Sequence, residues 1–267
     1  MAPESADERQ KRLHQRELFD TVAELYDASR RGYSSEIVDF VVATAGVHQD
    51  SQVLEVGCGT GQLTEALVQC GLAPMAIDIG PSMIAFARRR LGASTASFQE
   101  TSFEDFQATE ASFDLVVSAT AWHWIDPAVR FEKAARLLRP GGWLALLSTG
   151  EKYDDPFGSK LLEMWVDRSD DGGAWAKQRK LPGTGIDTST GLFETPIQKV
   201  RSEPMALPVE TVIGVENTRA TSLSWPADVR HRFTEELREH LRAQTEVSLT
   251  QVTSVTMARA LPKPVRG

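Results

Sequence analysis

The stretch "VLEVGCGTGQLTEAL", residues 53–67, joins an apolar run, three glycines at alternate positions and a helical pattern of apolar residues. Glycines at 57, 59 and 61 permit backbone angles that are closed to other residues, and they let a ligand lie against the main chain. The helix that follows offers free N–H groups and the positive end of its dipole to that ligand. The stretch therefore predicts a strand, a ligand-binding loop and a helix.

Short apolar runs alternate with helical segments on the C-terminal side of this stretch. Further strands are predicted at "APMAID", "TASFQE", "FDLVVSA" and "GGWLALLS", and Pro81 suits the first position of an intervening helix. This alternation is typical of a parallel, doubly wound α/β sheet, which binds its ligand at the carboxyl ends of the strands. Near the C-terminus, "KVRSEPMALP" and "TEVSLTQVTSVTMARAL" predict two more strands, and "WPADVRHRFTEELREHLRAQ" predicts an amphipathic helix.

The composition of the chain changes along its length and suggests five segments. Polar residues dominate the start, and the segment after the fifth predicted strand, with Trp165 and Trp175, mixes a short helix with glycine-rich loops. The expected segments are a flexible N-terminus (1–15), an N-terminal helical lid (16–45), a ligand-binding core (46–150), an inserted cap (151–192) and a C-terminal part of the sheet with helices (193–267).

The charge balance and the cysteine content exclude several classes of protein. The 267 residues include 29 basic and 37 acidic side chains, a net charge of −8, which argues against a nucleic-acid binder. No apolar run is long enough for a membrane span, and the polar N-terminus lacks a secretory signal. The two cysteines, Cys58 and Cys70, offer neither a disulfide framework nor metal-ligand spacing. We therefore expect a cytoplasmic protein without a metal, either a monomer or a homodimer.

The glycine spacing narrows the choice of ligand. A dinucleotide fingerprint needs a third glycine where Gln62 or Thr64 stands, so neither register fits. Glu55 before the loop would repel a pyrophosphate but could orient an ammonium group, and Asp78 at the end of the second strand can accept both ribose hydroxyls. A ligand with an amino acid and a nucleoside, but no phosphate, meets these conditions.

With "VLEVGCGTG", "AIDIG", "FDLVVSATAWHWID" and "LLRPGGWLAL", the sequence resembles class I S-adenosylmethionine-dependent methyltransferases. It is most similar to small-molecule enzymes of the ubiquinone-methyltransferase and trans-aconitate-methyltransferase type. The resemblance covers about residues 20 to 150 and implies a Rossmann-like sheet of seven strands, of which strand 7 is antiparallel. It also implies methyl transfer from S-adenosyl-L-methionine, with S-adenosyl-L-homocysteine as product.

The resemblance assigns roles around the cofactor. Glycines and Glu55 would shape the methionine side, Asp78 would bind ribose, and Ile79 and Met83 would enclose the adenine. The family often has an acid for the adenine amino group where Thr101 stands here, so adenine recognition is expected from the backbone near Ser102 and Phe103. The full set expected at the cofactor is Glu55, Gly57, Cys58, Gly59, Gly61, Asp78, Ile79, Met83, Ser102, Phe103, Ala119, Tyr26 and Arg30.

Residues of two other stretches are expected near the methyl acceptor. His123 is either a general base or a hydrogen-bonded supporting residue, because its ordinary pKa lies near neutrality. Trp122 and Trp124 either wall the cofactor or pack against the sheet. Tyr33 in "LYDASRRGYSSE" could close on the methyl donor, and Arg30 with Arg31 suggests a carboxylate acceptor.

Several functions remain open at this point. The favoured one is transfer of a methyl group to an O, N, S or C atom of a small molecule. A nicotinamide-dependent oxidoreductase is disfavoured by the failed glycine register. A macromolecule methyltransferase is disfavoured by the acidic charge and, for an enzyme that acts on DNA bases, by "SATAWHW" after strand four. A cofactor-binding module without activity is the remaining alternative.

Overall fold

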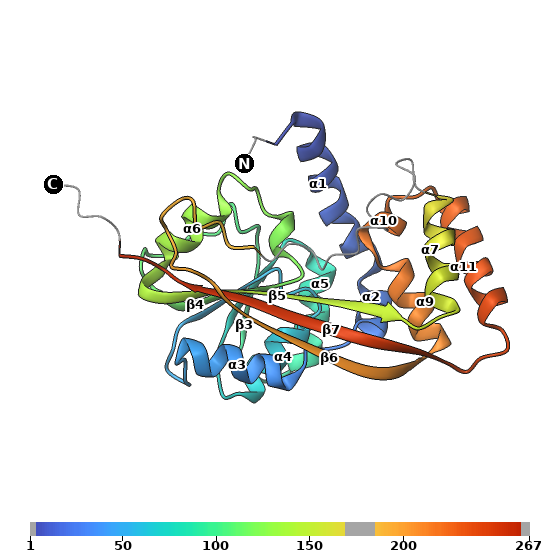
Figure 1. Ribbon diagram of the computed structural model, residues 1–267. Coiled ribbons are helices and arrows are strands. Elements are labelled where there is room, and N and C mark those ends of the chain that lie inside the picture. The colour runs from blue at the N-terminus through green and yellow to red at the C-terminus, as the bar shows by residue number, and fades with distance from the viewer. Residues whose placement is uncertain (1–3, 169–184, 263–267) are drawn as a thin grey trace.

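The computed structural model describes residues 4–168 and 185–262, and these build one sheet of seven strands. The strand order is β3-β2-β1-β4-β5-β7-β6, and β1 to β5 are parallel, whereas β7 is antiparallel to both of its neighbours (Figure 1). The expected Rossmann-like sheet with an antiparallel seventh strand is confirmed. The strands are β1 (Val53–Val56), β2 (Met75–Asp78), β3 (Ser97–Glu100), β4 (Phe113–Ala119), β5 (Leu138–Tyr153), β6 (Ile197–Pro208) and β7 (Glu246–Arg259).

Helices cover both faces of this sheet and extend beyond its far end (Figure 1). The helices are α1 (Ala6–Leu18), α2 (Ala23–Ser29), α3 (Ser35–Ala45), α4 (Gln62–Gln69), α5 (Pro81–Leu91), α6 (Arg130–Leu137), α7 (Phe157–Val166), α9 (Val209–Asn217), α10 (Ala220–Leu223) and α11 (Ala227–Leu241). Two short 3-10 helices, η1 (Phe19–Val22) and η2 (Trp122–Trp124), lie between them.

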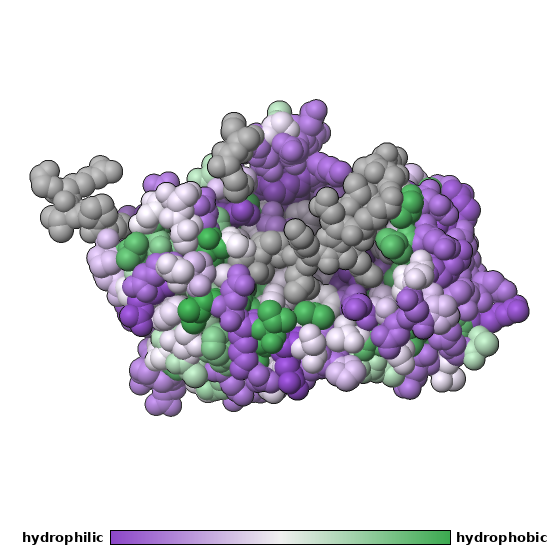
Figure 2. All heavy atoms as spheres, viewed as in Figure 1, coloured by the Kyte–Doolittle hydropathy of each residue, from purple (hydrophilic) through white to green (hydrophobic). Residues whose placement is uncertain are grey.

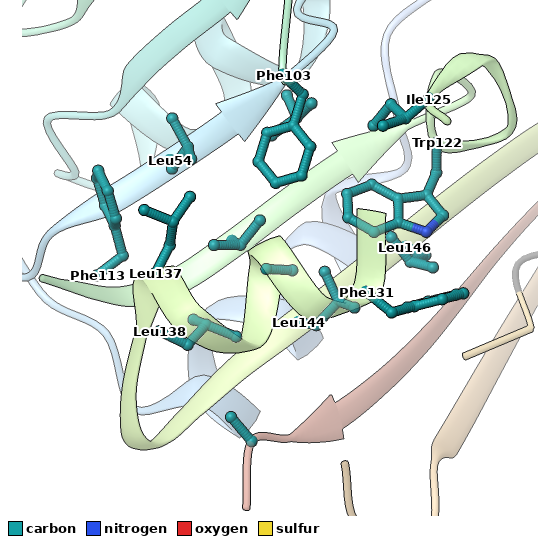
Figure 3. Close-up of a cluster of buried hydrophobic side chains, with 14 of the residues drawn as sticks. Leu54, Phe103, Phe113, Trp122, Ile125, Phe131, Leu137, Leu138, Leu144 and Leu146 are labelled. Atoms are coloured by element: carbon teal, nitrogen blue, oxygen red, sulfur yellow. The ribbon is translucent and has the colours of Figure 1, made fainter. Parts of the chain in front are cut away.

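Strand residues alternate between two hydrophobic clusters, as the two-residue period of a strand requires. Leu144 and Leu146 of β5 pack with α6 and with the aromatic rings drawn in Figure 3, whereas Ala145 and Leu147 pack with α3 and α4 on the other face. Both faces of the parallel strands are therefore buried, and the ligand-binding edge at their carboxyl ends is fixed between two cores.

The far ends of β5, β6 and β7 carry a third hydrophobic cluster with α7, α9 and α11. The expected division at residue 150 is not seen, because β5 continues to Tyr153 and stays paired with β7 throughout. Trp165 of α7 is buried in this cluster beside Phe233 of α11, so it belongs to a core and not to a separate cap. Trp175 lies outside the described residues.

The N-terminal segments also differ from the expectation. Residues 6–15 are helical because Ser5 and Glu8 form a capping box, so they are not a flexible tail. Helix α3 buries Ile37, Val38 and Val41 in the core behind the sheet, so only the chain before Ser34 lies over the ligand-binding edge.

The outer surfaces of α1 and α11 are hydrophilic (Figure 2). Within the ranges 4–168 and 185–262, every helix is too short or too polar to cross a lipid bilayer. The same ranges hold no group of histidine, cysteine and acidic side chains suited to a metal ion.

Candidate functional site

The glycine loop after β1 adopts the backbone conformation for which its sequence is suited. Gly57, Gly59 and Gly61 have φ angles of 71°, 54° and 91°, a left-handed region that disfavours other residues. A Cβ atom at Gly57 would lie 2.3 Å from the Cβ of Ala121, so the loop can approach the end of β4 only with glycine there. The alternate glycines thus bring the backbone close to the carboxyl ends of β1 and β4.

Asp78 at the end of β2 ties this loop to the start of α5. Its two carboxylate oxygens accept hydrogen bonds from the backbone N–H groups of Gly59 and Gly80, each at 2.9 Å. Burial raises the pKa of Asp78, and the two backbone hydrogen bonds act in the opposite direction. A carboxylate has about four acceptor positions, so those not taken by the backbone remain for ligand hydroxyls.

A cleft of about 720 Å³, its open mouth included, lies along the carboxyl ends of β1, β2 and β4. This size is within the usual range of small-molecule sites. The expected residues that line it are Tyr26, Gly57, Gly59, Asp78, Ile79, Met83, Phe103, Ala119 and Trp124. One cleft therefore brings together most of the cofactor residues expected from sequence.

Four of the expected cofactor residues lie behind the lining of this cleft. Gly61 is needed for packing, since a Cβ atom there would lie 2.9 Å from Leu91 of α5. Cys58 is buried, which raises the pKa of its thiol, and the Ser102 hydroxyl donates to Asp105 at 2.6 Å. Glu55 is the fourth. These four residues hold the walls and do not face the cleft.

Glu55 is an acid in the interior of the sheet. Its side chain is 1% exposed, and burial, with a smaller contribution from the charge of Asp78, raises its pKa to about 8. Its Oε2 atom has no hydrogen-bond partner among the described residues. Glu55 is therefore largely protonated at neutral pH.

Glu104 is a cleft residue that the sequence interpretation missed. Its Oε1 atom accepts from Arg16 of α1 at 3.0 Å and from the backbone of Asp126 at 3.1 Å. Its Oε2 atom is buried without a partner among residues 4–168 and 185–262. Glu104 stands three positions after Thr101, so the cleft has an acid on the loop after β3, where the sequence predicts backbone contacts alone.

The sequence predicts a lid at 16–45, but it does not single out the residues of α1 and η1 that reach the cleft. Arg16 of α1 and Phe19 of η1 line the cleft. Asp20 of η1 accepts from the backbone N–H of Met83 at 3.0 Å, and so caps the first turn of α5. The charged run before residue 20 gave the only available signal, and it carried no information about which strand ends it would face.

A second cavity adjoins the cleft and shares Phe19, Tyr26, Thr120 and Trp124 with it. We call this second cavity the chamber. Its other lining residues come from α4, η2, β5, α10, β7 and the loops that follow α2 and α9: Arg30, Arg31, Tyr33, Gln62, His123, Thr149, Glu151, Thr218, Arg219, Ala220, Thr221 and Gln251. Arg30, Tyr33 and His123 thus lie in the chamber and not in the cleft.

The chamber holds three arginines with different surroundings. Arg219 is paired with Glu151 at 2.9 Å and with the buried Glu216 at 2.8 Å. Arg30 donates only to neutral oxygens, the Thr218 hydroxyl at 3.0 Å and the carbonyls of Thr218 and Val215. Arg31 is exposed at the rim. The positive charges of Arg30 and Arg31 therefore have no acidic partner among the described residues.

His123 and Trp122 have different surroundings although they are neighbours in η2. Burial, and then the positive charge of Arg130, lowers the pKa of His123 to about 4, so the ring is neutral at pH 7. The indole of Trp122 points into the cluster of Figure 3, 5.6 Å from the ring of Phe103 and 5.7 Å from that of Phe131. Trp122 therefore packs against the sheet, whereas Trp124 walls the cleft.

Thr120 follows β4 where the cleft and the chamber meet. Its φ angle is 54°, a strained value for a β-branched residue that typically costs about 1–3 kcal/mol. Its hydroxyl donates to the carbonyl of Ala119 at 2.8 Å and lies 3.2 Å from the hydroxyl of Tyr33. The chain therefore keeps a costly conformation at the junction of the two cavities.

Comparison with known proteins agrees with this geometry. Residues 54–146 match the family model described as "Methyltransferase domain". An uncharacterized methyltransferase of Mycobacterium tuberculosis is 36% identical over 129 residues, which is 48% of this chain and 51% of that protein. A malonyl-[acyl-carrier protein] O-methyltransferase of Hahella chejuensis is 33% identical over 131 residues, 48% of this chain and 47% of that protein. The chain thus spans about half the length of these curated relatives.

A solved structure extends the likeness to most of the fold. The phosphoethanolamine N-methyltransferase 2 of Haemonchus contortus, in complex with phosphomonomethylethanolamine and S-adenosylhomocysteine, covers 91% of this chain and 58% of its own, with a TM-score of 0.53 and 16% identity. At that identity the likeness shows the fold alone. Residues 54–146 thus match the methyltransferase domain family, and the glycine loop and the seven-stranded sheet of this chain agree with that match.

Proposed function

We propose that this protein transfers a methyl group from S-adenosylmethionine to a small molecule that carries a negative charge. The observation that carries the proposal is the pair of adjoining cavities, one lined by most residues expected at the cofactor and one by Arg30 and Arg31, which lack an acidic partner among the described residues. The cofactor, when bound, supplies an electrophilic methyl group on a positively charged sulfur. All other contributions come from residues of this chain.

The cleft fits this cofactor by its buried polar groups. Asp78 would accept from the ribose hydroxyls, and the free Oε2 of Glu104 would accept from the adenine amino group. The apolar side chains of Ile79, Met83 and Phe103 would enclose the adenine ring. A buried acceptor left without a donor costs about 1–3 kcal/mol, so the orphaned carboxylate oxygen of Glu104 favours a ligand with an amino group there.

The chamber favours an anionic acceptor, and we take a carboxylate as the first choice. Arg30 and Arg31 could bind it, since guanidinium groups form paired hydrogen bonds with carboxylates. A carboxylate needs no deprotonation before it acts as a nucleophile, so the chain would contribute alignment and exclusion of water. An alcohol or amine would need a base, and the neutral ring of His123 would be available for that task.

Titration of the protein with S-adenosylhomocysteine tests the cofactor part. We expect Asp78→Ala to weaken binding about 100-fold or more, since it removes charge-assisted hydrogen bonds and releases the glycine loop. The matched control is Asp50→Ala, in an exposed loop, which should bind as the wild type does. Equal binding by the Asp78→Ala variant would contradict the cofactor assignment.

Assays on mono- and dicarboxylic acids, with S-adenosylhomocysteine as the measured product, test the acceptor part. For an acid that is methylated, Arg30→Gln and Arg31→Gln should each raise KM about 10-fold to 100-fold and leave the affinity for S-adenosylhomocysteine unchanged. Arg242→Gln, on the exposed end of α11, is the matched control. Unchanged KM values in both chamber variants would refute the anionic acceptor and leave the cofactor assignment intact.

A further inference from the structure

The junction between the cleft and the chamber contains a group of hydrogen bonds that no role assigned so far explains. Thr120 lines both cavities, and its neighbour Ala119 lines the cleft. The Thr120 hydroxyl donates to the Ala119 carbonyl at 2.8 Å, so the Tyr33 hydroxyl, 3.2 Å away, donates to Thr120. Burial raises the pKa of Tyr33 well above its usual value, so Tyr33 keeps its proton at any working pH.

The backbone of Thr120 is strained, so the hydrogen bonds at this junction come with an unfavourable conformation. A β-branched residue at a φ of 54° is an outlier, and glycine would take that conformation without strain. The other non-glycine residue with positive φ among those described is Ala111, at 53° in an exposed turn. Strain of this kind persists where surrounding contacts fix it, and it often occurs at ligand sites.

We infer that Thr120 is a positioning residue that orients the Ala119 carbonyl toward the ammonium group of the bound cofactor. This inference rests on the proposed function. One lone pair of the carbonyl accepts from Thr120, and the second would be left for the ammonium group of the cofactor. Tyr33 holds the Thr120 hydroxyl in place from the chamber side.

A comparison of four residues at position 120 separates the effect of the hydroxyl group from the effect of the strained backbone. Thr and Ser have the hydroxyl, whereas Ala and Gly lack it, and Gly alone relieves the strained φ. We expect Thr120→Ser to bind S-adenosylhomocysteine as the wild type does, and Thr120→Ala and Thr120→Gly to bind it about 3-fold to 10-fold more weakly. Melting temperatures should follow a different order, with Thr120→Gly about 2–4 °C above Thr120→Ala.

A second ligand distinguishes positioning from general damage to the cleft. 5′-Methylthioadenosine has the nucleoside and the sulfur but no ammonium group, so its affinity should be equal in all four proteins. Ala111→Gly is the matched backbone control, because it relieves the same strain far from the ligand and should change neither affinity.

The outcomes are distinct. Affinity for S-adenosylhomocysteine that follows the hydroxyl, with constant affinity for 5′-methylthioadenosine, supports the inference. Equal affinities of all four proteins for S-adenosylhomocysteine, or parallel losses for both ligands, overturn it and leave the proposed function standing. A wild type that binds neither ligand overturns the proposed function and this inference together.

Discussion

The cleft and the chamber share a wall but are built in different ways. The cleft is formed largely by strand ends and loops between residues 56 and 125, where the backbone and small or apolar side chains face the ligand. The chamber joins α2 to β5, α10 and β7, and the hydrogen bonds of Arg30 to Thr218 link residues far apart in sequence. A local motif thus specifies one cavity, whereas tertiary packing specifies the other.

The largest effect is expected on stability, from a substitution of Glu216 in the packed core behind the chamber. Glu216 is fully buried and accepts from Tyr153 at 2.9 Å, from Trp165 at 3.0 Å and from Arg219. Glu216→Gln removes one of the two carboxylates paired with the buried end of Arg219, so we expect the free energy of unfolding to fall by about 3 kcal/mol or more. Urea unfolding followed by fluorescence measures it, and Glu239→Gln, in an exposed pair on α11, is the control that should hardly change it.

The next prediction tests whether Glu104 belongs to the cleft as the adenine partner. Glu104→Gln should weaken the binding of S-adenosylhomocysteine about 10-fold, because an amide replaces the charged acceptor. The analogue with a 6-oxo group in place of the adenine amino group has no donor there, so it should lose less affinity than S-adenosylhomocysteine in the variant. Equal losses for both ligands would mean that Glu104 only supports Arg16 and the loop.

The raised pKa of Glu55 predicts how the stability of the folded protein depends on pH. The pKa of Glu55 is about 8 in the folded protein and 4.5 in the unfolded chain. Its contribution to the free energy of unfolding is therefore fully present below pH 4.5 and is lost as the pH rises toward 8. Asp78, whose pKa is also raised, acts in the same direction. Glu55→Gln should therefore flatten the decline of the unfolding free energy between pH 5 and 8, which is at most about 1.4 kcal/mol per pH unit. Identical slopes in the two proteins would contradict this assignment.

The smallest effect is expected in the chamber at His123. With a carboxylate acceptor, His123→Asn should lower kcat less than about threefold, far from the 10²-fold to 10⁴-fold loss of a general base. Because the pKa of His123 is about 4, its ring keeps one charge state between pH 6 and 8, so it should add no pH dependence to kcat there. A loss of 100-fold or more would indicate an acceptor that must be deprotonated.

The contrast between the two cavities also explains what the sequence could predict. The sheet followed from apolar runs that alternate with helical segments, and most cleft residues followed from the resemblance to methyltransferases, because a motif and the strand end beside it are local. The sequence does not predict Glu104 as a cleft residue, because its position depends on the length of a loop. It predicts a flexible N-terminus at 1–15, where Ser5 and Glu8 in fact cap α1. The alternatives for Trp122 were decided by packing, which no periodicity in "ATAWHWIDP" reveals.

The long pairing of β5 with β7 has a consequence for how ligands enter. The two strands stay hydrogen-bonded from Trp143 and Arg259 to Tyr153 and Leu249, and Thr149, Glu151 and Gln251 of this ladder line the chamber. Such a ladder leaves no hinge between the part that holds the cleft and the helices that close the chamber. By contrast, the chain before Ser34 lines the two cavities with side chains of α1, η1 and α2, so we expect small molecules to enter and leave through movement of this segment. Exchange of amide hydrogens in residues 6–34 should accordingly respond to ligand, while that in the β5–β7 ladder stays slow throughout.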